Sequence, residues 1–203
     1  MAVDAVRAEH AVREFLAALG VDAEAAGMEK TPARVAEMYA YLFDGLGRDA
    51  AEAFGEPIEA GSSGLVAVQG IPFFSMCEHH LVPFFGTVDI VYQPNGGRIA
   101  GFTHFVEAVA IAAHRPQLQE RLTHDIADAV QRGLGATGVL AVCHARQLCM
   151  TLREGGTYGT ETTTSETIGV FANNFLLSQQ AWALLKPPSQ RGEGPQGQGE
   201  CRR

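Results

Sequence analysis

A thiol and two imidazoles lie within four residues of one another, in the segment CEHH at positions 77–80. The segment follows an apolar run and precedes VPFF at 82–85, which is typical of a tight turn between two apolar segments. From such a turn Cys77 and His80, three residues apart, can bind one metal ion. Structural zinc sites usually carry two such pairs, so one pair is only a weak sign of a metal.

A third ligand could come from Cys149, far along the chain in the segment QLCM at 147–150. Three protein ligands and an open fourth position are typical of a catalytic zinc, whose bound water has a pKa near about 7. We expect this segment to be a strand. Strand alternation then puts residues 143, 145, 147 and 149 on one face and His144 on the other. The pattern leaves open whether Cys143 also touches the metal.

Two helices are expected before these motifs. Residues 3–19 carry apolar side chains at spacings of three and four, and Gly20 ends the run. Thr31 and Pro32 open a second helix toward Gly45, with Thr31 as its N-cap and Pro32 in the first turn. The sequence therefore predicts an N-terminal helical segment over residues 1–50.

After this helical segment the sequence pattern changes to one of short strands and helices. We expect strands at 65–68, 87–92, 98–100, 138–149 and 158–167, a hairpin turn at 94–97, and helices at 103–113 and 116–133, the second opening at Pro116. Helices that alternate with antiparallel hairpins indicate an α+β domain, here over residues 51–185. Residues 186–203 hold Pro, Gly, Gln and Arg with almost nothing apolar, which predicts a disordered tail.

Composition excludes several kinds of partner. The 203 residues are 46% hydrophobic and carry a net charge of -8, the wrong sign for general binding to nucleic acid. No run of eighteen apolar residues suggests a membrane span. Four cysteines in a chain of this size do not form a secreted disulfide framework. We therefore expect a cytoplasmic protein that binds neither nucleic acid nor membrane.

Several blocks together resemble the GTP cyclohydrolase I family. They are CEHH at 77–80, QLQERLT at 117–123, Ala145 followed by Cys149-Met150, and TTTS at 162–165, and the segment KTPARVA at 30–36 is also similar. The resemblance covers residues from about 10 to about 185. It implies a tunnelling fold (T-fold) with N-terminal helices, an antiparallel sheet and two helices on one face. Such subunits assemble into rings, which implies a homo-oligomer, a decamer of two rings, with sites at subunit interfaces.

The resemblance also implies roles for individual residues. Cys77, His80 and Cys149 fall on the ligands of a Zn²⁺ cofactor, and His79 falls on a catalytic histidine suited to protonating a purine nitrogen. Gln119 and Glu120 fall on the residues that hold the guanine edge. Taken by itself, Glu120 is better explained as an acidic residue complementing a helix dipole.

Two parts of the site depart from the family. Its second catalytic histidine is replaced by Gln147, which cannot titrate near neutral pH. Its triphosphate-binding cations correspond here to a mixed set whose charges sum to about zero, with Thr103 in place of a serine: Arg34, Glu37, His104, Glu107 and Arg153. A carboxylate beside a phosphate oxygen is repulsive by roughly 1 to 4 kcal/mol per close pair.

From these residues we hypothesise a zinc-dependent hydrolase of this family that opens the imidazole ring of a guanine-like purine, or acts on a related pterin heterocycle. Its substrate would carry fewer phosphates, or the reaction would stop before the pterin ring closes. One alternative is the ordinary GTP cyclohydrolase I reaction, which makes dihydroneopterin triphosphate. Another is a non-catalytic protein that binds purines or pterins.

Overall fold

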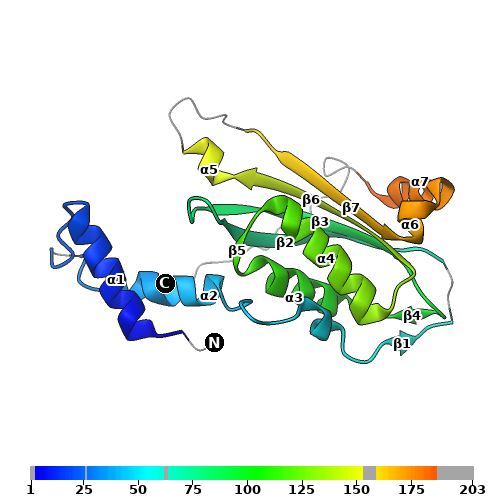
Figure 1. Cartoon of the computed structure of the whole chain (residues 1–203), viewed down its shortest axis with the longest axis horizontal. Coiled ribbons are helices and arrows are strands. Elements are labelled where there is room, and N and C mark those ends of the chain that lie inside the picture. Colours follow the sequence, from blue (N-terminus) through cyan, green and yellow to red (C-terminus); the bar gives the residue numbers. More distant parts are fainter. Residues whose placement is uncertain (1–2, 26, 62–63, 153–158, 187–203) are drawn as a thin grey trace, which may run out of the picture.

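A five-stranded sheet forms the centre of the chain in the computed structural model, which describes residues 3–25, 27–61, 64–152 and 159–186 (Figure 1). The strand order is β5-β2-β3-β6-β7. Four strands pair antiparallel: β2 (Val66–Cys77), β3 (Pro83–Gln93), β6 (Gly138–Gln147) and β7 (Thr162–Gly169). The two-residue strand β5 (Pro116–Gln117) pairs parallel with the end of β2. A small second sheet joins β1 (Ile58–Glu59) to β4 (Arg98–Ile99).

Strands β3 and β6 approach each other closely at Gly86. A Cβ atom at this position would lie 1.8 Å from the carbonyl oxygen of His144. Only glycine therefore fits this pairing without a shift of the backbone.

Helices α3 (Phe102–Ala113) and α4 (Gln119–Leu134) cover one face of the sheet. The 3₁₀ helix η1 (Ala50–Phe54) packs against both of these helices. The main core lies between them and the sheet, where Phe54 meets Phe105 edge to face at 5.1 Å between ring centres. On the opposite face, α6 (Val170–Asn173) and α7 (Phe175–Leu184) cover one end only.

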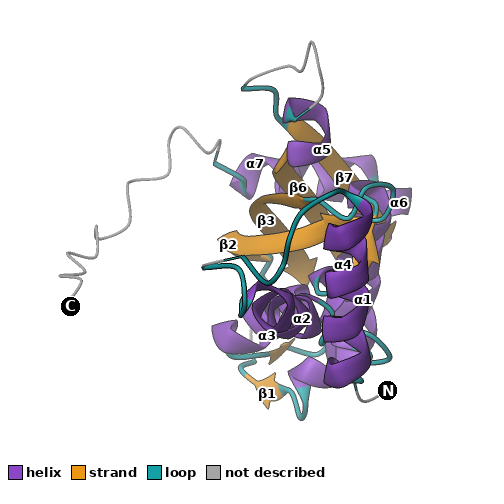
Figure 2. Cartoon of the chain, turned by 90° about the vertical axis from the view of Figure 1, so that its left-hand side faces the viewer, coloured by secondary structure: helices purple, strands orange, loops and turns teal. Residues whose placement is uncertain are grey.

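Two N-terminal helices project from the sheet domain (Figures 1 and 2). Helix α1 (Ala5–Ala18) begins after Asp4, whose side chain caps it, and packs against α2 (Thr31–Leu42). None of the residues of α1 is buried within this chain. Among the described residues, no helix is long and apolar enough to cross a membrane.

The α+β architecture expected from the sequence is confirmed, and four local expectations were wrong. The turn at 94–97 does not close a hairpin, because β4 pairs with β1 whereas β3 lies between β2 and β6. Pro116 lies in β5, because its neighbours hydrogen-bond to the end of β2, and the next helix begins only at Gln119. Strand β6 ends at Gln147, so Cys149 lies in the short helix α5 (Leu148–Thr151) rather than on a strand. The cap of α2 is Lys30, and Thr31 is already helical.

The division at residue 50 stays a prediction. The tail was predicted from 186; Lys186 is described, and 187–203 lie outside the described residues.

Candidate metal centre and active-site pocket

The turn after β2 brings Cys77 and His80 together. The Cys77 N–H donates to the Val82 carbonyl at 2.9 Å, and the Leu81 N–H donates back to the Cys77 carbonyl at 2.8 Å. Leu81 has φ of 50°, in the left-handed region that residues with a side chain seldom adopt. Backbone in this region is characteristic of functional turns. The Tyr39 hydroxyl of α2 donates to the Leu81 carbonyl at 3.1 Å and holds the turn from outside.

The turn and α5 together form one cluster of metal-ligating atoms. One ligand atom each from Cys77, His80 and Cys149 lies within 4.8 Å of the others, and Cys77 Sγ is 4.0 Å from His80 Nδ1. Zinc–sulfur bonds of about 2.3 Å and zinc–nitrogen bonds of about 2.0 Å need ligand atoms about 3.5 to 4 Å apart in a tetrahedral site. Two thiols and an imidazole are also ligands that zinc prefers. The cluster therefore fits a zinc ion with little movement.

Cys143 is not part of this cluster. Its side chain is fully buried on β6, and burial raises the pKa of its thiol to about 12. Among the described residues, the ligand atoms within 4.8 Å of one another belong to Cys77, His80 and Cys149 and not to Cys143. The question that the sequence left open is thus answered for the described residues: Cys143 belongs to the core.

A pocket of about 220 Å³ adjoins the metal cluster. Its lining includes Cys77, His79, Glu120, Gln147 and Cys149, which come from the turn after β2, the first turn of α4, the end of β6 and α5. His79 and Glu120 are exposed, whereas Gln147 is half-buried. The pocket thus places an imidazole and a carboxylate beside the three candidate metal ligands.

Two polar contacts join the turn after β2 to β5 and to the first turn of α4. The Glu78 N–H donates to the Gln117 carbonyl at 3.1 Å, and Arg121 forms an ion pair with the Glu78 carboxylate. Glu78 and Arg121 lie in the blocks CEHH and QLQERLT, yet sequence reasoning gave neither of them a role. Their contact explains how the two blocks keep one geometry.

Gln119 is buried at the base of the pocket, with 3% of its surface exposed. Its Nε2 donates to the Cys143 carbonyl at 3.1 Å and to the Thr162 carbonyl at 2.9 Å. Its Oε1 accepts from Gln147 Nε2 at 2.7 Å. Gln119 was expected to hold a guanine edge, but both N–H groups of its side chain donate to backbone carbonyls.

The resemblance aligned five residues and Thr103 with the triphosphate-binding positions of the family. Those of them that the structure describes do not line this pocket. Arg34 and Glu37 are exposed on α2, and Thr103 is exposed near the start of α3. His104 Nδ1 lies 2.7 Å from the Ala53 carbonyl, which makes this nitrogen the protonated one because a carbonyl only accepts. Arg153 lies outside the described residues.

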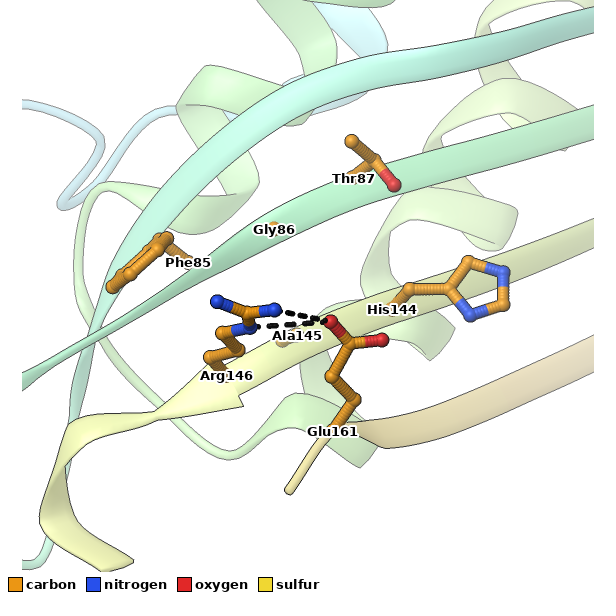
Figure 3. A pocket seen from close by; sticks show the side chains of 7 residues that line it. All are labelled: Phe85, Gly86, Thr87, His144, Ala145, Arg146 and Glu161. Carbon is orange, nitrogen blue, oxygen red and sulfur yellow. Dashed lines mark hydrogen bonds and ion pairs between the residues drawn. The ribbon is translucent and has the colours of Figure 1, made fainter. Parts of the chain in front are cut away.

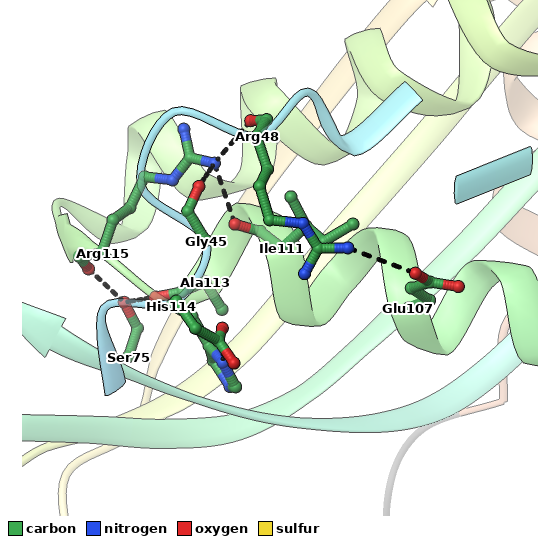
Figure 4. Close-up of polar contacts among 9 residues, drawn as sticks. Gly45, Arg48, Ser75, Glu107, Ile111, Ala113, His114 and Arg115 are labelled. Atoms are coloured by element: carbon green, nitrogen blue, oxygen red, sulfur yellow. Dashed lines mark hydrogen bonds and ion pairs between the residues drawn. The ribbon is translucent and has the colours of Figure 1, made fainter. Parts of the chain in front are cut away.

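Glu107 is one helical turn beyond Thr103, and its Oε1 is 3.3 Å from Arg48 Nη2 (Figure 4). Beside this ion pair, the Arg115 guanidinium donates to the Gly45, Arg48 and Ile111 carbonyls and fixes the loop that carries Arg48. Sequence reasoning identified Glu107 but missed Arg48, because 59 residues separate the partners.

A second hollow of about 260 Å³ lies on the opposite face of the sheet, lined by residues of β3 and β6 and by Glu161 (Figure 3). His144 lies there, with Nδ1 3.0 Å from Thr163 Oγ1 and Nε2 3.6 Å from the buried Asp89 carboxylate. The expectation that His144 points away from the metal face is confirmed. It cannot stand in for the missing histidine at position 147.

The fold and the pocket define an α+β protein in which two cysteines and a histidine that could hold a metal ion lie beside a further histidine and a carboxylate. Comparison with known proteins agrees: the family model described as GTP cyclohydrolase I matches residues 8–186. The chain belongs to the GTP cyclohydrolase I family and is a cyclohydrolase.

Curated relatives match over nearly their whole length. GTP cyclohydrolase 1 of Halalkalibacterium halodurans is 44% identical over 91% of this chain and 98% of its own. GTP cyclohydrolase 1 of a Geobacillus species is 42% identical over 88% and 95%. A solved structure, archaeosine synthase QueF-Like in the apo form, matches 53% of this chain and 96% of its own with a TM-score of 0.43 and 18% identity.

Proposed function

We propose that this chain is a zinc-dependent cyclohydrolase that opens the imidazole ring of GTP, as the names of its relatives indicate. The observation that carries the proposal is the convergence of Cys77, His80 and Cys149 beside the pocket that His79 and Glu120 line. Family membership over 88% or more of the chain supports it. The relatives' names favour this reaction over the altered substrate that the sequence suggested.

In this proposal, one group of side chains binds the metal and another binds the heterocycle. Cys77, His80 and Cys149 would hold the zinc, which supplies Lewis-acid activation of water for attack on C8 of guanine. His79 is exposed at the same pocket and can deliver a proton to the ring nitrogen that becomes the leaving amine. The Glu120 carboxylate accepts hydrogen bonds from the N–H groups of the guanine edge.

A second candidate is the same ring opening on a guanine compound with fewer phosphates, ending before the pterin ring closes. Two observations favour it. Glu37 and Glu107 place carboxylates where the family places cations, and Gln147 cannot perform the proton transfers of a histidine. Arg48 weakens the first observation, since it already neutralises Glu107 within the chain.

The same proposal implies that several copies of this chain assemble. Arg34 and Thr103 are not among the residues that line the pocket of their own chain, so a complete site would take its phosphate-binding residues from a neighbouring copy. This supports a homo-oligomeric ring with sites between subunits, and the family resemblance suggests a decamer. Light scattering of the purified chain tests the assembly, and a monomer would contradict it.

Substrate comparison tests the chemistry. Zinc-loaded protein is incubated with GTP, GMP and guanosine, and formate and the purine product are followed by mass spectrometry. Formate from GTP together with dihydroneopterin triphosphate supports the ordinary reaction. Formate from GMP or guanosine in preference to GTP, without pterin, supports the second candidate. Binding without turnover of any of the three would leave a non-catalytic purine-binding protein.

A further inference from the structure

The direction of the hydrogen bonds around Gln119 can be read without ambiguity. Backbone carbonyls only accept, so the side-chain atom of Gln119 that contacts the Cys143 and Thr162 carbonyls must be its amide nitrogen. Its Oε1 must then face Gln147. Because Oε1 only accepts, Gln147 must present its own amide nitrogen at the 2.7 Å contact.

This chain of bonds leaves one acceptor of the Gln147 amide for the pocket. One N–H of Gln147 is directed at Gln119, so its second N–H and its Oε1 remain, and Oε1 is the acceptor available to the pocket that Gln147 lines. Gln119 is buried and held at both of its donors, so it cannot rotate to let Gln147 turn over. A buried amide that lost one of these partners would bear the full cost of an unmet hydrogen bond.

We propose that Gln119 is a positioning residue for Gln147, and that Gln147 acts as a fixed hydrogen-bond acceptor for an N–H group of the bound heterocycle. The proposal rests on the proposed function, since it assumes that this pocket holds a guanine compound. In it, position 147 contributes binding and orientation rather than proton transfer. Gln119 acts through Gln147 and not by its own contact with the ligand.

The Glu120 carboxylate supports this assignment. It lines the same pocket, and like Gln147 Oε1 it can only accept hydrogen bonds when ionised. Two acceptors from different elements, the start of α4 and the end of β6, select a planar ligand that carries several N–H donors. An amide locked in its opposite orientation would offer a donor beside the carboxylate and would reject such a ligand.

Three substitutions at position 147 distinguish the bond that this amide donates to Gln119 from the bond that it accepts from the ligand. Q147E is isosteric but places a second oxygen against Gln119 Oε1. Q147M has a similar shape, cannot donate and accepts only weakly. Q147H can donate from one ring nitrogen to Gln119 Oε1 and keep the other as an acceptor. Q69M serves as a matched control, since Gln69 bonds Leu184 and Lys186 near α7.

The test is calorimetric binding of guanosine and GTP to zinc-loaded protein, with metal content measured for each variant. We expect Q147M to keep zinc but to bind guanosine at least about tenfold more weakly, because a ligand N–H loses its acceptor. Q147E should also keep zinc and bind guanosine at least about tenfold more weakly, because repulsion between its carboxylate and Gln119 Oε1 removes the bond that orients the side chain. Q147H should stay within about threefold of the native protein, and Q69M should be unchanged. Without ligand, Q147M should melt about 2–4 °C lower than the native protein, since Gln119 Oε1 loses its donor.

The outcomes separate this proposal from the function on which it rests. If the native protein binds guanosine or GTP, and Q147M and Q147E bind it equally well, the positioning role is wrong and the proposed function stands. If Q147H binds as weakly as Q147M, the acceptor role is wrong. If the native zinc-loaded protein binds no guanine compound, both this proposal and the proposed function fail.

Discussion

Glu107 and Arg48 form an ion pair, 3.3 Å between Oε1 and Nη2, at a position where the family resemblance places a phosphate-binding cation. Both side chains are about half exposed, so the pair is weak and screened by salt. The two charges cancel within the chain. The negative charge introduced by Glu107 therefore repels a phosphate less than an isolated carboxylate would.

Removing the carboxylate should free Arg48 for the nucleotide. In Glu107→Gln we expect the KM for GTP to fall about two- to fivefold, the range that an exposed ion pair of about 0.5–1 kcal/mol allows. The KM for guanosine should not change, which makes the nucleoside an internal control. An equal change for both compounds would show that Glu107 does not face the phosphates.

The two cysteines near the pocket should differ in metal binding. In Cys149→Ser we expect the zinc content to fall from about one per chain to near zero, because the cluster loses one of its three ligands. Cys143→Ala should keep its zinc and lose only about 1 kcal/mol of stability, since Cys143 is a buried, protonated core thiol. Atomic absorption on the dialysed proteins measures both. Equal zinc loss in the two variants would place Cys143 in the metal site.

The pair Cys77 and His80 could be predicted as metal ligands because its information is local, two residues three apart in a turn. The helix–strand alternation likewise predicted the α+β class. Both depend on periodicity and short spacing, which a single sequence carries. Cys149 lies far along the chain on an expected strand that also carries Cys143, so its choice as the third ligand rested on the family resemblance.

The parts that the sequence missed depend on contacts between distant residues. The pairs Gln119–Gln147 and Arg48–Glu107 join residues 28 and 59 positions apart. Strand β5 has only two residues and exists because β2 pairs with it. Such features follow from tertiary packing, which overrides local propensity.

Glu120 should bind the heterocycle and not the metal. Glu120→Gln replaces one acceptor oxygen by a donor, so we expect guanosine binding to weaken by at least about tenfold while zinc content stays constant. Glu161→Gln is the matched control, because Glu161 pairs with Arg146 at the hollow on the other sheet face. Unchanged binding in Glu120→Gln would return this residue to the role of a helix-dipole partner.

The metal turn should depend on Tyr39. In Tyr39→Phe the Leu81 carbonyl loses the hydroxyl that it contacts at 3.1 Å, and we expect zinc affinity to fall about fivefold for the loss of about 1 kcal/mol. Tyr41→Phe is the control, since the Tyr41 ring packs on Phe74 and His114. Competition with a zinc chelator measures both variants. A larger loss in Tyr41→Phe would contradict the role of Tyr39.

The pair between Asp49 and Arg132 should make a small part of the stability pH-dependent. Hydrogen bonds from Arg132 and from the Ala51 N–H lower the pKa of the Asp49 carboxyl from 3.8 to about 2. A lowered pKa stabilises the fold fully above pH 3.8, and this contribution is lost as the pH falls toward 2. Asp49→Asn should therefore cost about 0.5 kcal/mol at pH 7 and nothing near pH 2, as measured by thermal unfolding. A constant difference across this range would exclude the ion pair as the cause.

Release of formate from GTP labelled at C8 tests the central claim most directly. The account predicts zinc-dependent release by the native protein, none after chelation, recovery on adding zinc back, and none from Cys149→Ser. Absence of formate from GTP, GMP and guanosine alike, in protein that carries one zinc per chain, would contradict the claim that this pocket opens a guanine ring.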